Sequence, residues 1–160
     1  MNPDFTGFVL AGGKSSRMGA DKFSLEFGGE SFLKRAVNVL KTVCAGTKIV
    51  LNQTQSVETN LPVVRDVYAE RGALGGIHAA LKSCETKFAF ILAVDLPFVT
   101  TGAVENLIKI ALSSNKFTAF VPRQTDGRLQ PLCAVYRAKY CLPPLERVLN
   151  ENNKASVRDF

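Results

Sequence analysis

The sequence has one histidine, four cysteines and no long hydrophobic run. Its longest uninterrupted apolar stretch, Phe88 to Val94, is seven residues long, whereas a membrane-spanning helix needs about 20. A secretory leader places a basic segment before an apolar one, and the N-terminus shows no such pattern. We therefore expect a cytoplasmic protein that does not enter a membrane.

The cysteines also lack the spacing of a metal site. Cys44, Cys84, Cys133 and Cys141 form no C-x-x-C pair, and His78 stands apart from all of them. Structural zinc usually takes two ligands from such a closely spaced pair. The pattern favours buried, reduced thiols over zinc ligands.

Charge of one sign is not concentrated in any segment. The chain has 20 Lys and Arg against 14 Asp and Glu, a formal net charge of +6, and no run of five like charges. Basic tails that bind nucleic acid contain such runs. A small anionic substrate suits the charge at least as well as nucleic acid does, and the motifs favour the small substrate.

The alternation of short apolar runs with helix-spaced segments predicts the fold. The 160 residues are enough for one domain, residues 1–160, with its own core. Helices are predicted from Ser31 as N-cap, near 74–84, near 101–113 and after 138; strands are predicted at 7–10, 48–51, 62–65, 88–94, 117–121 and 129–136. This order predicts a three-layer α/β/α, Rossmann-like fold with a mostly parallel sheet.

The fold class predicts where a ligand binds. In open α/β sheets the site lies beyond the carboxyl ends of the strands. The loops that follow the predicted strands begin at Ala11, Asn52, Asp66 and Asp95. We expect the functional residues to gather there.

The loop after the first strand reads L-A-G-G-K-S-S-R-M-G-A-D-K, from Leu10 to Lys22. Glycines let backbone N–H groups approach a phosphate, and Lys and Arg neutralise its charge. The spacing fits neither a P-loop nor a dinucleotide-binding G-x-G-x-x-G. We interpret the loop as a polyphosphate site in which Arg17 and Lys22 bind a triphosphate. The alternative is an exposed turn whose cations are solvated, and for the side chain of Lys14 we favour this alternative.

This string resembles the L-A-G-G-x-x-x-R-M-G-x-D-K motif of nucleotidyltransferases with a nucleotide-diphospho-sugar transferase fold. R-G-A-L-G-G-I, at 71–77, is similar to the G-P-L-A-G-I pattern of their guanylyl branch, with Ala73 and Gly75 in place of proline and alanine. Further likenesses are V-R-D at 64–66, V-D-L-P-F at 94–98 and G-R-L-Q-P at 127–131. Together they make the chain resemble the molybdenum cofactor guanylyltransferase family.

The resemblance implies transfer of GMP from GTP to molybdopterin cofactor, with release of pyrophosphate and with Mg²⁺ as the cofactor. It implies transient contact with molybdoenzymes or their chaperones. It also implies nucleotide contacts from Leu10, Ala11, Gly12, Gly13, Lys22, Asn52, Asp66 and Asp95.

Asp95 ends the most apolar predicted strand. Mg²⁺ is commonly held by one or two carboxylates together with substrate phosphates, so we predict Asp95 as the metal ligand. With Arg17 and Lys22 it forms the predicted catalytic set. The alternatives are a turn-capping role for Asp95 and plain loop roles for Asn52 and Asp66.

Other interpretations stay open. The first-loop motif is shared with cytidylyl- and sugar-phosphate nucleotidyltransferases, so the chain can also be one of these. The family's N-x-N-T-P-E-like motif is not found in these residues, which leaves open a non-catalytic nucleotide- or cofactor-binding protein. Gly75 and Gly76 permit either close approach to the nucleotide or close helix packing. His78 is predicted to be structural, and Arg123 and Arg128 are exposed cations or contacts for the acceptor's phosphate.

Overall fold

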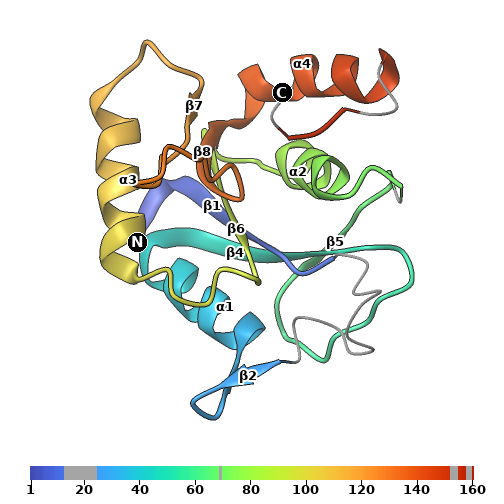
Figure 1. Cartoon of the computed structure of the whole chain (residues 1–160), viewed down its shortest axis with the longest axis vertical. Helices are drawn as coiled ribbons and strands as arrows, with labels where there is room; N and C mark the ends of the chain where they lie inside the picture. Colours follow the sequence, from blue (N-terminus) through green and yellow to red (C-terminus); the bar gives the residue numbers. More distant parts are fainter. Residues whose placement is uncertain (13–24, 69, 152–154, 158–159) are drawn as a thin grey trace.

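A computed structural model describes residues 1–12, 25–68, 70–151, 155–157 and 160 (Figure 1). Its helices and strands follow the predicted alternation. In chain order they are β1 (Asn2–Leu10), β2 (Glu26–Phe27), β3 (Glu30–Ser31), α1 (Phe32–Val43), β4 (Cys44–Leu51), β5 (Val63–Arg65), α2 (Ala73–Lys82), β6 (Phe88–Ala93), α3 (Thr101–Ser113), β7 (Ala119–Phe120), β8 (Cys133–Arg137) and α4 (Ala138–Glu151).

The main sheet has the strand order β5-β4-β1-β6-β8-β7. The first four strands are parallel, β8 runs antiparallel to β6, and β7 runs antiparallel to β8. Helices α1 and α3 pack on one face and α2 and α4 on the other; in Figure 1 the last two lie above the strands and α1 below them. The predicted three-layer, mostly parallel fold is confirmed.

The longest apolar run of the sequence forms strand β6, which is covered on both faces. Phe88, Phe90 and Leu92 point to the α1/α3 side, whereas Ala89, Ile91 and Ala93 point to the α2/α4 side. Every residue of the strand is buried. A central strand covered on both faces needs apolar residues at every position rather than at alternate ones.

The predicted N-cap Ser31 is confirmed, and Thr100 caps α3 in the same way. The Ser31 hydroxyl accepts a hydrogen bond from the Lys34 N–H at 3.2 Å, and the Thr100 hydroxyl accepts one from the Ala103 N–H at 3.3 Å. These bonds satisfy N–H groups that a helix leaves unpaired in its first turn. Pro143-Pro144, expected either to start or to interrupt a helix, lies inside α4.

Two predicted strands were too long, and one hairpin was not predicted. The segment 129–136 enters the sheet only at Cys133, and 117–121 contributes only Ala119 and Phe120. The β2–β3 hairpin turns at Gly28 and Gly29, with φ of 63° and 77°. Glycine adopts this backbone conformation without strain, which suits a two-residue hairpin turn.

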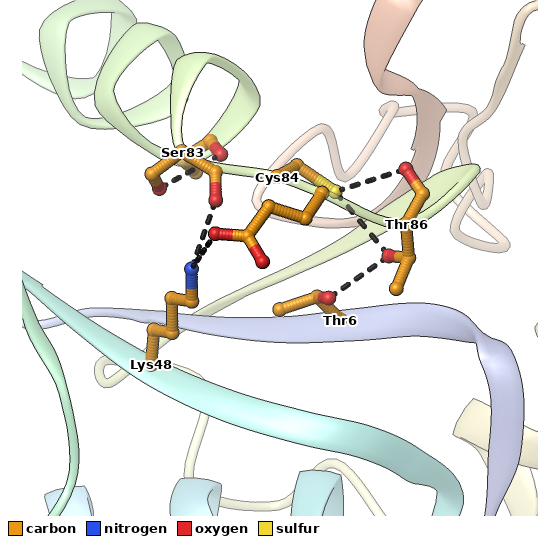
Figure 2. Close-up of polar contacts among 7 residues, drawn as sticks. Thr6, Lys48, Ser83, Cys84 and Thr86 are labelled. Carbon is orange, nitrogen blue, oxygen red and sulfur yellow. Dashed lines mark hydrogen bonds and ion pairs between the residues drawn. The ribbon is translucent and has the colours of Figure 1, made fainter.

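The amino ends of the parallel strands are tied together by side chains (Figure 2). Lys48 Nζ donates to the Ser83 carbonyl at the end of α2, at 2.9 Å, and lies 3.7 Å from the Glu85 carboxylate. The hydroxyls of Thr6 and Thr86 are 2.8 Å apart, and the Cys84 sulfur lies 3.4 Å from the Thr86 hydroxyl. These contacts join α2 to β1 and β4 at the end of the sheet opposite the predicted site.

The four cysteines are free thiols. Cys44 and Cys141 are buried as predicted, whereas Cys84 and Cys133 are only half-buried. Burial raises the pKa of the Cys44 thiol to about 12 and that of Cys133 to about 11. In the part of the chain that the structure describes, no helix is long and apolar enough to cross a membrane.

Candidate nucleotide and metal site

The carboxyl ends of the parallel strands bring the predicted loops together. The N–H groups of Ala11 and Gly12 donate to the Val50 carbonyl at 2.9 and 3.1 Å, so the loop after β1 starts against β4. The Val94 N–H donates to the Leu10 carbonyl at 3.1 Å, which places the end of β6 on the other side of β1. Three sequence-distant segments therefore meet at one edge of the sheet.

A cleft of about 180 Å³ opens at this edge. Its walls come from the start of the first loop, the N-terminal turn of α2 and the end of β6. The lining residues are mostly small: Leu10, Ala11, Gly12, Gly72, Ala73, Gly76, Ala93, Val94, Asp95 and Leu132. The structure thus places four predicted site residues, Leu10, Ala11, Gly12 and Asp95, around one cavity.

Gly12 is sterically required at its position. A Cβ built on it would lie 2.8 Å from the backbone nitrogen of Asn52 and 3.2 Å from the carbonyl carbon of Leu51. Backbone atoms at these distances cannot move aside without disturbing β4. The glycine therefore lets the first loop lie directly against the β4 loop and leaves a wall of backbone beside the cleft.

Asn52 follows β4 and is engaged in its own turn. Its side-chain oxygen accepts from the Thr54 N–H at 3.0 Å and from the Gln55 N–H at 2.9 Å. Its carbonyl accepts from an Arg65 guanidinium nitrogen at 2.8 Å. These are the bonds of an Asx turn, and Asn52 does not line the cleft; its contact with a nucleotide stays a prediction.

Asp66 follows β5 and is a buried carboxylate, only 7% exposed. It accepts the Tyr68 N–H at 2.7 Å. A Cβ built on Gly75 would lie 2.5 Å from both of its carboxylate oxygens, so the glycine leaves the space that the carboxylate occupies beside the first turn of α2. Burial raises the pKa of Asp66, and the Tyr68 N–H and nearby His78 offset part of that rise.

The two glycines of α2 therefore have different roles. Gly75 permits close packing against Asp66, whereas Gly76 lines the cleft and would tolerate a Cβ, since the nearest Leu10 atom would lie 3.5 Å away. The packing interpretation is confirmed for Gly75, whereas close approach of Gly76 to a nucleotide stays a prediction. Asp66 lies behind the cleft wall, so its direct contact with a nucleotide stays a prediction.

Asp95 is exposed at the end of β6. It lines the narrow cleft and also a wider cavity of about 640 Å³ on its other side. Within residues 1–12, 25–68, 70–151, 155–157 and 160, no three Asp, Glu, His or Cys side chains gather into a metal-binding cluster. A carboxylate at a strand end fits Mg²⁺, which keeps several waters and takes other ligands from substrate phosphates.

The remaining predicted residues divide into two groups. Gly13, Arg17 and Lys22 lie outside the described residues, as does Lys14, so their roles stay predictions. Arg128 pairs with Asp126 on an exposed loop, with 2.6 Å between Nη2 and the carboxylate, and this ion pair lowers the pKa of Asp126. The structure does not place Arg128 or Arg123 at the cleft.

His78 is buried in α2, away from the cleft lining, as expected of a structural residue. Its Nε2 lies 3.4 Å from the Glu146 carboxylate of α4, and its ring meets Tyr68 edge-on with 4.8 Å between centroids. Arg71 donates to the Leu149 and Val148 carbonyls of the same helix. These contacts, which no sequence pattern indicated, hold α2 and the segment just before it against α4.

The fold and the cleft define an α/β protein of the nucleotide-diphospho-sugar transferase class. The solved structure of molybdopterin-guanine dinucleotide biosynthesis protein A from Archaeoglobus fulgidus has this fold; it is 23% identical, with a TM-score of 0.78 over 96% of this chain and 77% of that chain. The chain belongs to the family described as the MobA-like NTP transferase domain, whose model matches residues 7–159.

Two relatives resemble the chain over most of its length. A protein of Pelotomaculum thermopropionicum named as a probable molybdenum cofactor guanylyltransferase is 38% identical over 97% of this chain and 73% of its own. A protein of Clostridium perfringens with the same name is 34% identical over 91% of this chain and 72% of its own. The family resemblance expected from the sequence motifs is confirmed.

Proposed function

We propose that the protein transfers GMP from GTP to molybdopterin cofactor, with release of pyrophosphate and with Mg²⁺ as the cofactor. The observation that carries the proposal is the position of Asp95, at the mouth of a cleft walled by backbone and small residues. The names of the relatives supply the choice of substrates. The R-G-A-L-G-G-I segment, whose Gly72 and Gly76 line the cleft, favours GTP over the other nucleotides.

The reaction is a substitution at phosphorus. A phosphate oxygen of the acceptor forms a bond to the α-phosphorus of GTP, and the bond from that phosphorus to the bridging oxygen of the β-phosphate breaks. Pyrophosphate leaves with the electron pair of the broken bond, so nothing is oxidised or reduced. Negative charge must be stabilised on the transferring and leaving groups, and catalysis is mainly positioning and electrostatics.

This work is divided among residues of the loops that follow the strands. The backbone from Leu10 to Gly12 and the first turn of α2 hold the nucleotide, and Gly12 keeps that backbone free of a side chain. Asp95 holds the metal ion, which when bound neutralises phosphate charge. Arg17 and Lys22 bind the triphosphate. Asn52 and Asp66 support the two walls and contact the nucleotide at its edge.

The cellular setting follows from the same proposal. A pathway that loads molybdenum cofactor into enzymes requires the product to leave the protein, so we infer transient contact with molybdoenzymes or their chaperones. Such a protein works in the cytoplasm.

The test is pyrophosphate release measured with GTP, CTP, UTP or ATP, each with and without molybdopterin and Mg²⁺. Release that needs GTP, the acceptor and the metal together supports the proposal. Release with CTP or with a sugar phosphate identifies a different nucleotidyltransferase. A GTP-dependent rise in melting temperature without any release identifies a binding protein; a ligand at ~100 times its Kd adds ~2.7 kcal/mol of stability, which is a shift of roughly 5–10 °C.

A further inference from the structure

The wide cavity beside Asp95 is almost entirely apolar. Its volume is about 640 Å³, and every lining residue except Asp95 and Thr100 is hydrophobic. Leu25 and Phe32 form one side, and Pro97 and Phe98 of the loop after β6 form the other. Pockets for small organic ligands have this size and character, with an apolar lining and a few polar groups.

Two exposed aromatic rings contact each other beside this cavity: Phe98 lines the cavity, and Phe27 packs against Phe98. Phe98 is 71% exposed and Phe27, in the β2–β3 hairpin, is 52% exposed. Their ring centroids are 5.4 Å apart and the rings meet edge-to-face. Large apolar side chains that gather on a surface mark interaction sites, and aromatic faces favour stacking against other flat rings.

Arg35 of α1 holds the Phe27 and Phe98 rings in place. Its Nε donates to the Pro97 carbonyl at 3.2 Å, and its guanidinium carbon lies 5.8 Å from the centroid of the Phe27 ring. Its Nη1 is 3.8 Å from the Glu30 carboxylate, also in the hairpin. One arginine therefore links the hairpin to the loop after β6, the two segments that carry the rings.

We propose that the wide cavity is the acceptor subsite, and that Phe98 and Phe27 bind the flat heteroaromatic ring of the acceptor. This inference rests on the proposed function. Asp95 lines both the wide cavity and the narrow cleft, so the two cavities meet at this residue. An acceptor whose ring lies on Phe98 places its phosphate end at Asp95, where the α-phosphate of a nucleotide in the narrow cleft also lies.

The kinetic test uses Phe98→Ala, with Phe117→Ala as a matched control. Phe117 is also an exposed ring, 58% exposed, in edge-to-face contact with Phe120 and away from both cavities. We expect Phe98→Ala to raise the KM for molybdopterin about 5- to 30-fold, the usual effect of losing one stacking contact. The KM for GTP stays unchanged, and Phe98→Tyr restores the acceptor KM. An unchanged acceptor KM overturns the proposal.

A binding test separates this proposal from the transferase activity. The probe is 6-hydroxymethylpterin phosphate, whose fluorescence anisotropy is followed on titration with the wild-type protein and both variants. Binding that Phe98→Ala weakens and Phe117→Ala does not supports the acceptor subsite, even if no pyrophosphate is ever released. No saturable binding to the wild-type protein overturns it. A change confined to sedimentation of the Phe98→Ala variant identifies a self-association surface instead and also overturns it.

Discussion

The two ends of the parallel sheet are built in opposite ways. Toward the amino ends of the strands, the hydroxyls of Thr6 and Thr86 meet, and Lys48 from the middle of β4 extends its ammonium group to the end of α2 (Figure 2). At the carboxyl ends, small residues and backbone line a cleft beside the exposed carboxylate of Asp95. The first end holds strands and helices together, and the second offers a surface to a ligand.

The comparison predicts that stability and activity depend on different ends. Removing a polar group at the amino ends should lower the melting temperature and leave substrate binding unchanged. Removing the carboxylate at the carboxyl ends should lower the reaction rate and leave the melting temperature unchanged. The following substitutions test this division, from the largest expected effect to the smallest.

Asp95→Asn should have the largest effect on activity. It keeps the size of the side chain but removes the charge that holds the metal, so we expect the rate of pyrophosphate release to fall on the order of 100-fold or more. The melting temperature should stay within about 1 °C because the side chain is exposed. Asp126→Asn, at an exposed loop away from the cleft, is the control, and full activity in Asp95→Asn would contradict the assigned role.

Gly75→Ala should break the packing between α2 and the β5 loop. The added methyl group would displace the Asp66 carboxylate and weaken its bond to the Tyr68 N–H, at a cost of about 1–3 kcal/mol. Thermal denaturation measures the loss. Gly102→Ala is the matched control in α3, where an added Cβ meets nothing within 4 Å; there we expect no loss, and a gain of up to ~1 kcal/mol from helix propensity. Equal effects of the two substitutions would refute the packing role.

Thr86→Val tests the amino ends. It preserves shape but removes the hydroxyl that meets Thr6 and donates to the Phe88 carbonyl at 3.1 Å. We expect a loss of about 1–2 kcal/mol in the free energy of unfolding, because the buried Thr6 hydroxyl loses that partner. The KM for GTP should not change. Thr42→Val, on the exposed face of α1, is the control and should cost less than about 0.5 kcal/mol.

The smallest expected effect is the contribution of Asp66 to the pH dependence of stability. Its pKa is raised in the folded protein, so between the ordinary value of 3.8 and the folded value the folded state binds more protons than the unfolded state. Stability therefore falls as pH rises through that window and stays reduced above it. Urea denaturation from pH 3.5 to 7 should show this fall for the wild type and a flatter profile for Asp66→Asn. Parallel profiles for the two proteins would contradict a raised pKa of the buried Asp66 carboxylate.

The sequence predicted the elements that carry a long or well-bounded signal. The seven-residue apolar run at 88–94 identified β6, and Ser31 marked the start of α1. The strands β2 and β3 were missed because each is two residues long, too short to show any periodicity, although Gly28-Gly29 is a hairpin signal. Strand β7 lies inside the predicted strand 117–121 but is only two residues long.

The site was predictable only in part. Ala11 and Asp95 were predicted to lie at the site because strand ends in an α/β sheet meet at one edge, and the family resemblance implied nucleotide contacts from Leu10 and Gly12 as well. The structure places all four around one cleft, and their contact with a nucleotide stays a prediction. The contact between Asp66 and Gly75, and that between Phe27 and Phe98, depend on tertiary packing of segments that share no local pattern. The asymmetry between the two ends of the sheet likewise became visible only with the structure.

The most direct test of that asymmetry measures pyrophosphate release by Asp95→Asn and Thr86→Val side by side. Both assays use saturating GTP, molybdopterin and Mg²⁺, at a temperature where both variants are folded. The account predicts a loss on the order of 100-fold for Asp95→Asn and a rate within about twofold of the wild type for Thr86→Val. Equal rates for the two variants would contradict it.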